Sequence, residues 1–213
     1  MTDFQRARSP EQREARRRAI LGAAAELLAE APLAEISLRE LARRVGLSKT
    51  NVVRYFETRE AVFFALLNQA IEDWLAELPA DLPADDPAAV PGALARSLAA
   101  RPLLCELWSS LGTELERNIS ADAVRDFKLT HSALQARLAV LLTERIPALT
   151  GPAAREFVAL TILLLAGLWP FANPAPAVAE AVTDPRLAHS RVDFPARLGR
   201  ALEVTLTGLL ALG

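Results

Sequence analysis

Residues 37–60, SLRELARRVGLSKTNVVRYFETRE, constrain the fold of this chain more than any other segment. Ser37 and Glu40 have the spacing of a capping box, and apolar residues three and four positions apart follow them, as in a short amphipathic helix. Gly46 comes where that pattern stops, and glycine adopts the positive φ that helix ends often need at no steric cost. Ser48 can then cap a second helix. The segment therefore predicts two helices joined by a tight turn.

The second of these helices has an apolar side and a polar side. Val52 and Phe56 can pack back onto the first helix, which leaves the polar side chains opposite. A helix of this size fits the DNA major groove, where Lys contacts guanine, Asn pairs with adenine and Thr contacts a thymine methyl, while Tyr and Arg suit phosphates. The pattern favours a DNA-reading helix-turn-helix over an ordinary hairpin with a solvated face. The residues assigned to DNA binding are Ser37, Ser48, Lys49, Thr50, Asn51, Val53, Arg54, Tyr55 and Arg59.

The same segment resembles the helix-turn-helix of the TetR family of one-component transcriptional repressors. The resemblance covers about residues 15–65 and does not extend as a motif beyond them. Thr50 stands where a smaller residue is frequent, and Val53 where a tyrosine is frequent, so Val53 offers a thymine methyl or a sugar an apolar contact. The operator sequence of other members therefore does not transfer to this chain. The matching residues are Ser37, Leu41-Ala42, Val45-Gly46-Leu47, Ser48, Val52, Tyr55-Phe56 and Arg59-Glu60.

The rest of the chain predicts helices and no strands, so the expected fold class is all-α. A long helix follows Thr58 to about residue 77, and a Pro and Asp cluster at 79–91 interrupts the helical pattern. Pro147 and Pro170 predict helix ends. The stretch 170–185 predicts a loop with at most one short helical turn, and further helices are expected at 88–100, 102–117, 121–145, 152–168 and 195–212.

Charge is distributed unevenly along the chain. Residues 1–60 hold 12 Lys and Arg against 9 Asp and Glu, whereas residues 61–213 hold 12 against 17. A basic N-terminal segment favours contact with phosphates, and a solvated charged face is the alternative explanation. We divide the chain into an N-terminal three-helix helix-turn-helix DNA-binding domain, 1–60, and a larger C-terminal helical ligand-binding and dimerisation domain, 61–213.

The composition argues against several other classes of protein. Cys105 is the single cysteine, which excludes an intrachain disulfide and a cysteine-cluster zinc site. With two histidines and no G-x-S-x-G, H-E-x-x-H, P-loop or G-x-G-x-x-G motif, we expect no enzyme, no metal and no cofactor. The Arg-rich start is not a signal peptide, and the apolar run at 157–169 is shorter than the roughly 20 residues that span a bilayer. We expect a cytoplasmic protein with no membrane partner.

Two long C-terminal helices are apolar enough to need cover on several sides. The simplest cover is a two-fold interface in which both helices of each subunit form a four-helix bundle, which the TetR resemblance also implies. A purely intramolecular core is the alternative. In a homodimer, two recognition helices about 34 Å apart read a palindromic operator in successive major grooves. The residues assigned to the interface are Phe157, Leu160, Leu164, Leu168, Leu198, Leu202, Leu206 and Leu209.

The middle helices carry apolar and aromatic side chains that can line a ligand cavity, and the TetR resemblance implies an inducer pocket in this half. Ordinary core packing explains the same pattern. His131 stands out, because a lone imidazole among apolar neighbours can orient a polar group of a ligand. The residues assigned to a small-molecule effector are Leu104, Trp108, Leu111, Phe127, His131, Leu134, Leu164 and Trp169.

The expected function is that of a one-component repressor that binds a palindromic double-stranded DNA operator as a dimer. A small apolar or aromatic ligand would release it, with the long helix after Thr58 transmitting the change. The alternatives are a repressor without an inducer, an activator, and a helical ligand-binding protein that does not bind DNA. The intact polar residues between Lys49 and Tyr55 argue against the last of these.

Overall fold

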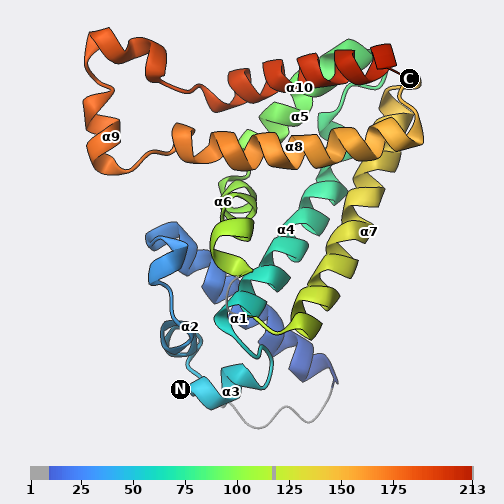
Figure 1. Ribbon diagram of the computed structural model, residues 1–213. Helices are drawn as coiled ribbons and strands as arrows, with labels where there is room; N and C mark the ends of the chain where they lie inside the picture. The colour runs from blue at the N-terminus through green and yellow to red at the C-terminus, as the bar shows by residue number, and fades with distance from the viewer. Residues whose placement is uncertain (1–9, 117–118, 213) are drawn as a thin grey trace.

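The computed structural model describes residues 10–116 and 119–212, which form helices and turns without a strand, so the all-α fold class is confirmed (Figure 1). Short 3-10 segments η1, η2 and η4 and a π-helical segment η3 join the α-helices. The α-helices are α1 (Pro10–Glu30), α2 (Leu38–Val45), α3 (Lys49–Val53), α4 (Arg59–Asp81), α5 (Val90–Ala99), α6 (Pro102–Ser110), α7 (Ala121–Arg145), α8 (Gly151–Ala172), α9 (Pro176–Ala181) and α10 (Phe194–Leu212). The other segments are η1 (Leu33–Glu35), η2 (Pro87–Ala89), η3 (Leu111–Leu115) and η4 (Pro185–Ser190).

The predicted helix-turn-helix is present, with its caps formed as the sequence indicated. The Ser37 hydroxyl accepts the backbone N–H of Glu40 at 3.2 Å and begins α2. Gly46 ends that helix with φ of 73°, the left-handed conformation that glycine adopts most easily. The Ser48 hydroxyl accepts the backbone N–H of Asn51 at 3.2 Å and begins α3. The two caps and the glycine fix the turn between the helices.

The helices are arranged with the helix-turn-helix at one end of the molecule and α8 and α10 together at the other (Figure 1). Helix α4 joins the two ends, and α7 packs along it. Helix α6 contacts both α1 and α8. Helix α10 packs closely on α5, where a Cβ on Gly199 would lie 3.5 Å from both Ala95 Cβ and Gly92 Cα. Helices α4 and α6 therefore connect the DNA-binding end with the body.

A buried tryptophan and a polar cluster fix the far end of α4 against α5. Trp74 is 1% exposed, and its indole N–H donates to the Ser97 hydroxyl at 3.0 Å. Ser97 in turn donates to the Asp81 carboxylate at 2.7 Å. Arg101 donates to the Ser97 carbonyl oxygen and to the Glu77 carboxylate, each at 2.7 Å. These contacts hold the C-terminal part of α4 in place on the body.

Two helices continue through a proline, so the predicted helix end at Pro170 is wrong. A proline lacks the N–H that bonds the carbonyl four residues earlier and crowds that carbonyl, and α8 and α4 each end two residues after their proline. In α8 the backbone N–H of Asn173 donates to the Trp169 carbonyl oxygen at 3.0 Å, and the Asn173 side chain donates to it at 3.1 Å. In α4, which contains Pro79, the last turn closes similarly with Leu82 N–H bound to the Leu78 carbonyl oxygen at 3.2 Å.

Other helix boundaries lie close to the predicted ones. Helix α7 covers 121–145 as expected, and α9 is the one short helix within the stretch 170–185. Helix α6 is shorter than the expected 102–117, because the chain changes to π-helical geometry after Ser110. Residue 117 lies outside the described residues.

Helix α8 is long and apolar enough, by length and composition, to cross a membrane. It is longer than the run at 157–169 because it begins at Gly151 and continues through Pro170, and 33% of its most apolar window is buried inside the fold. It packs against α6, α7 and α10. The core helix of a soluble protein passes the same test, so α8 is weak evidence for a membrane segment.

Candidate nucleic-acid interface and effector cavity

Helix α3 presents four polar side chains to solvent at the end of the molecule. Lys49, Thr50, Asn51 and Arg54 are all exposed, whereas Val52 on the opposite side of the helix is completely buried. Within the part of the chain that the structure describes, Lys49 and Arg54 form no ion pair. Their charges are therefore available to a partner with phosphates and base edges.

The residues around this set lie on the same helix or at its ends. Val53 is 41% exposed, while Tyr55 is half-buried and packs against the hydrophobic core. Ser37 and Ser48 are exposed at the N-termini of α2 and α3, where helix ends favour anions. Eight of the nine residues assigned from the sequence thus lie at or near the surface of the helix-turn-helix.

Arg59 is the exception, because its guanidinium group points into the domain. It donates to the carbonyl oxygens of Leu33, Ala34 and Ile36 at 3.2–3.3 Å. It also pairs with the carboxylate of Glu60 at 3.1 Å, and the Glu60 side chain is only 7% exposed. These four partners occupy the donors that a phosphate would need. We therefore leave Arg59 out of the proposed DNA contacts and assign it a structural role.

Helix α2 carries three arginines, none of which was assigned a role from the sequence. Arg44 donates to the carboxylates of Glu30 and Glu26 on α1, at 3.0 and 3.2 Å, and the Glu30 pKa is lowered by this hydrogen bond. Arg39 and Arg43 are exposed and lie four residues apart on one face of α2. The spacing of Arg39 and Arg43 in the sequence could have indicated a second basic surface next to α3.

The residues assigned to a ligand mostly fill the core of the C-terminal body by packing on one another. The Trp108 indole N–H donates to His131 Nε2 at 3.4 Å, and His131 Nδ1 lies 3.2 Å from the Asn68 side-chain oxygen. Phe127 stacks on Phe64 with ring centroids 4.1 Å apart. These contacts join α4, α6 and α7. Leu104, Trp108, Phe127, His131, Leu134 and Trp169 are buried, and Leu111 and Leu164 are partly exposed.

Burial of His131 predicts a loss of stability in mild acid. Burial lowers the pKa of His131 to about 4, with a smaller contribution from Lys128, whereas the unfolded chain keeps a pKa near 6.5. The unfolded state therefore takes up the proton first as pH falls. The contribution of His131 to the free energy of unfolding should be fully present above pH 6.5. It should fall by about 2 kcal/mol between pH 7 and pH 5.

Urea unfolding at pH 7 and pH 5 measures this difference. Carboxylates titrate in the same range, so His131→Gln is the control, since it keeps a neutral polar side chain and removes the titrating group. The variant should show a smaller decrease between the two pH values than the parent protein. An equal decrease in both proteins would assign the acid sensitivity to other groups.

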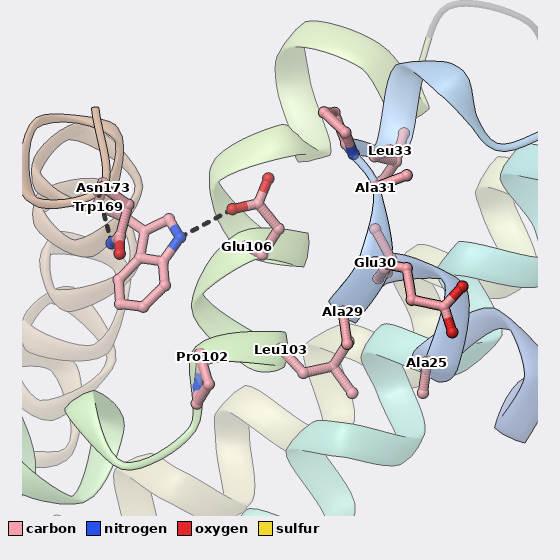
Figure 2. A pocket seen from close by; sticks show the side chains of 12 residues that line it. Ala25, Ala29, Glu30, Ala31, Leu33, Pro102, Leu103, Glu106, Trp169 and Asn173 are labelled. Carbon is pink, nitrogen blue, oxygen red and sulfur yellow. Dashed lines mark hydrogen bonds between the residues drawn. The ribbon is translucent and has the colours of Figure 1, made fainter. Parts of the chain in front are cut away.

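A cavity of about 500 Å³ lies where the helix-turn-helix domain meets the body (Figure 2). One wall comes from the C-terminal part of α1 and the segment after it, and the other from α6 and the end of α8. Of the residues assigned to a ligand, Trp169 lines this cavity, and its indole N–H donates to the Glu106 carboxylate at 2.9 Å. The twelve lining residues are Ala25, Leu28, Ala29, Glu30, Ala31, Pro32, Leu33, Pro102, Leu103, Glu106, Trp169 and Asn173.

The residues assigned to a dimer interface divide into two groups. Phe157, Leu198, Leu202, Leu206 and Leu209 are at most 9% exposed within the single chain, where α10 packs on α5 and α8. The chain's own helices cover these five side chains, as the intramolecular alternative expects. Leu160, Leu164 and Leu168 are partly exposed, and they lie with Leu163 and Phe171 on one side of α8, which we call the outer α8 face. Leu163 and Phe171 are 67% and 71% exposed.

Comparison with known proteins finds a matching family model for each half of the chain. The family model described as "Bacterial regulatory proteins, tetR family" matches residues 20–66, and "Tetracyclin repressor-like, C-terminal domain" matches residues 68–212. The HTH-type transcriptional regulator RutR of Escherichia coli K12 is 38% identical over 66 residues, which are 31% of each chain. This chain therefore matches about a third of the length of that relative.

Solved structures share the fold over nearly the whole chain. A TetR transcriptional regulator from Rhodococcus sp. RHA1 has a TM-score of 0.59 and 22% identity, covering 92% of this chain and 97% of that one. FadR from Bacillus subtilis, solved with stearoyl-CoA, has a TM-score of 0.56 and 17% identity, covering 89% and 97%.

The helix-turn-helix, the exposed polar side chains of α3 and the all-helical body together fit a DNA-binding transcriptional regulator. The chain belongs to the TetR family. Among the described residues, no cluster of three or more His, Cys, Asp or Glu side chains is arranged to hold a metal ion.

Proposed function

We propose that this protein is a repressor that binds a palindromic operator as a homodimer in the cytoplasm and leaves the operator when a small molecule binds. The observation that carries the DNA half is the exposed polar set on α3, held outward by the Ser48 cap and the buried Val52. The base-contacting residues are Lys49, Thr50 and Asn51, and Arg54 and Tyr55 contact phosphates. Arg39 and Arg43 of α2 extend the phosphate contacts. We propose no catalytic activity, cofactor or membrane partner.

We place the proposed homodimer interface on the outer α8 face. Leu160, Leu163, Leu164, Leu168 and Phe171 form an apolar surface that water contacts in a single chain. Val204 on α10, a helix that packs on α8, is also exposed, at 55%. Patches of this kind on helices mark protein interfaces more often than isolated exposed residues do. In a dimer that reads a palindrome, the two-fold axis relates two α3 helices that lie in successive major grooves, about 34 Å apart.

Leu163→Arg should convert the dimer into a monomer, because a two-fold axis brings each new charge into an apolar contact without a partner. Sedimentation velocity measures the change in mass, and circular dichroism should be unchanged because Leu163 is exposed in the single chain. Leu129→Arg is the matched control, since Leu129 is 66% exposed on α7, outside this face. A dimer that persists in Leu163→Arg would place the interface elsewhere.

Release by a ligand requires that the ligand bind the two conformations of the dimer unequally. A 100-fold loss of operator affinity needs about 2.7 kcal/mol of coupling. The stearoyl-CoA complex of FadR supports ligand binding as a property of this fold. Helix α4 runs from the helix-turn-helix to the body and is the element that would carry the change.

Fluorescence anisotropy with DNA that flanks the protein's own gene tests the DNA half. We expect tighter binding to this DNA than to a shuffled fragment of the same length, and a steep loss of affinity as salt rises. Equal affinity for both fragments would refute specific operator recognition on this DNA and favour a helical ligand-binding protein.

A further inference from the structure

We propose that the cavity between α1, α6 and α8 is an effector site for an organic ammonium ion with an apolar body. The inference rests on the proposed function, because it names the chemistry and the place of the signal that releases the protein from DNA. It differs from the ligand site expected from the sequence, whose residues mostly pack on one another in the core.

The cavity has the size and the surface of a site for a small organic molecule. Its volume is about 500 Å³, within the range of about 300–1,000 Å³ that is usual for such sites. Ala25, Leu28, Leu33 and Leu103 make most of its walls apolar. Residues at the rim, among them Ala29 and Pro102, are exposed, so a ligand can enter from solvent.

The charge of the lining selects the chemistry of the ligand. The lining includes two acidic residues and no Lys, Arg or His. Glu30 already pairs with Arg44, but Glu106 forms no ion pair with any residue that the structure describes. Its carboxylate accepts one neutral donor, the Trp169 indole N–H, at 2.9 Å. A partly buried carboxylate beside apolar walls is stabilised by a cation that brings its own counter-charge.

Trp169 holds the Glu106 carboxylate at one end of the cavity. Figure 2 shows the indole ring of Trp169 and the Glu106 carboxylate next to each other, joined by the hydrogen bond. An ammonium group at this end contacts the carboxylate and donates to the oxygen that the indole N–H does not occupy. The apolar part of the ligand then lies along Leu103 toward α1.

The position of the cavity connects ligand binding to the recognition helix. Its α1 wall and Leu33 belong to the helix-turn-helix domain, whereas α6 and α8 belong to the body. The carbonyl of Leu33 is also bound by Arg59 at the start of α4. A molecule between these walls acts on their separation, and it shifts the dimer toward the conformation in which its contacts are better.

Calorimetric titration of the full-length protein with three matched probes tests the chemistry of the site. The probes are 4-phenylbutylamine, which is a cation at pH 7, the neutral 4-phenylbutanol, and the anion 4-phenylbutyrate. We expect the amine to bind about tenfold more tightly than the alcohol, and the carboxylate to bind least, because of the unpaired Glu106. Equal affinities for the amine and the carboxylate would overturn the proposed ligand class.

Two variants and one control locate the binding site. Glu106→Gln keeps an acceptor for Trp169 and removes the charge, so it should weaken the amine about tenfold and leave the alcohol nearly unchanged. Ala29→Trp fills the cavity from an exposed position and should abolish binding of both. Glu144→Gln is the control, since Glu144 borders a different apolar groove on α7. If both Glu106→Gln and Ala29→Trp bind the amine as tightly as the parent protein does, the proposed site is wrong.

The regulatory part is tested on promoter DNA by the same anisotropy assay. Saturating 4-phenylbutylamine should lower the DNA affinity at least about tenfold, Glu106→Gln should need about tenfold more amine, and butylamine should have no effect at equal concentration. If the amine fills the cavity and the DNA affinity stays the same, the cavity is not an effector site. Failure of the unliganded protein to bind the DNA specifically would instead refute the proposed function, and calorimetry would still decide the cavity.

Discussion

Replacing Lys49, Asn51 and Arg54 together by alanine should lower the affinity for operator DNA by about 100-fold or more and leave the folded protein as stable as before. Each good base contact in the major groove discriminates by about 1–3 kcal/mol, and each phosphate contact adds to the salt-dependent affinity. All three side chains are exposed, and the cap on α3 uses the backbone of Asn51, which alanine retains. Anisotropy titration and thermal unfolding measure the two quantities.

A matched control separates recognition from net charge. Arg155→Ala with Arg200→Ala removes two exposed positive charges on α8 and α10, at the opposite end of the molecule from the helix-turn-helix (Figure 1). This control should change the operator affinity by less than about threefold, as expected for charges outside the interface. If the triple variant binds operator as well as the parent protein, α3 is not the reading helix.

Arg59→Met should destabilise the protein by about 3–5 kcal/mol, the cost of leaving a buried charge without its partner. The substitution leaves the Glu60 carboxylate, 7% exposed, and the carbonyls of Leu33, Ala34 and Ile36 without their guanidinium donor. Because these carbonyls belong to the segment between α1 and α2, the loss should affect the helix-turn-helix most. Urea unfolding followed by circular dichroism measures the stability.

The double variant Arg59→Met with Glu60→Met tests the reason for that loss. Removing both charges leaves no buried ion, so the double variant should be more stable than Arg59→Met alone. The neighbouring carbonyls still lack their donor, so recovery should be partial. A loss below about 1 kcal/mol in Arg59→Met would show that the network contributes no more than an exposed pair.

The local part of the site could be predicted from sequence because its signals are local. Ser37, Gly46 and Ser48 act within three or four residues of their own position, and all three form the predicted caps and turn. The exposed polar side chains of α3 could be predicted from Val52, because the side of a helix opposite a buried residue faces solvent. Arg59 could not be assigned in this way, since three of its four partners are 23–26 residues earlier and only the fold brings them together.

The C-terminal body was less predictable because its helices are apolar on more than one side. Periodicity shows that Leu198 and Leu202 are buried, but it does not show whether α5 of the same chain or a second subunit covers them. Similarly, aromatic spacing cannot distinguish Trp108, which packs in the core, from Trp169, which lines a cavity. The continuation of α8 past Pro170 depends on Asn173 closing the last turn, which the proline itself does not indicate.

Footprinting of the DNA that flanks the protein's own gene tests the central claim, that two α3 helices of a dimer read a palindrome. We predict one protected region with two half-sites centred about 34 Å apart, which is one helical turn. The protection should disappear in the variant with Lys49, Asn51 and Arg54 replaced. Protection without two-fold symmetry, or the same protection with that variant, would contradict the claim.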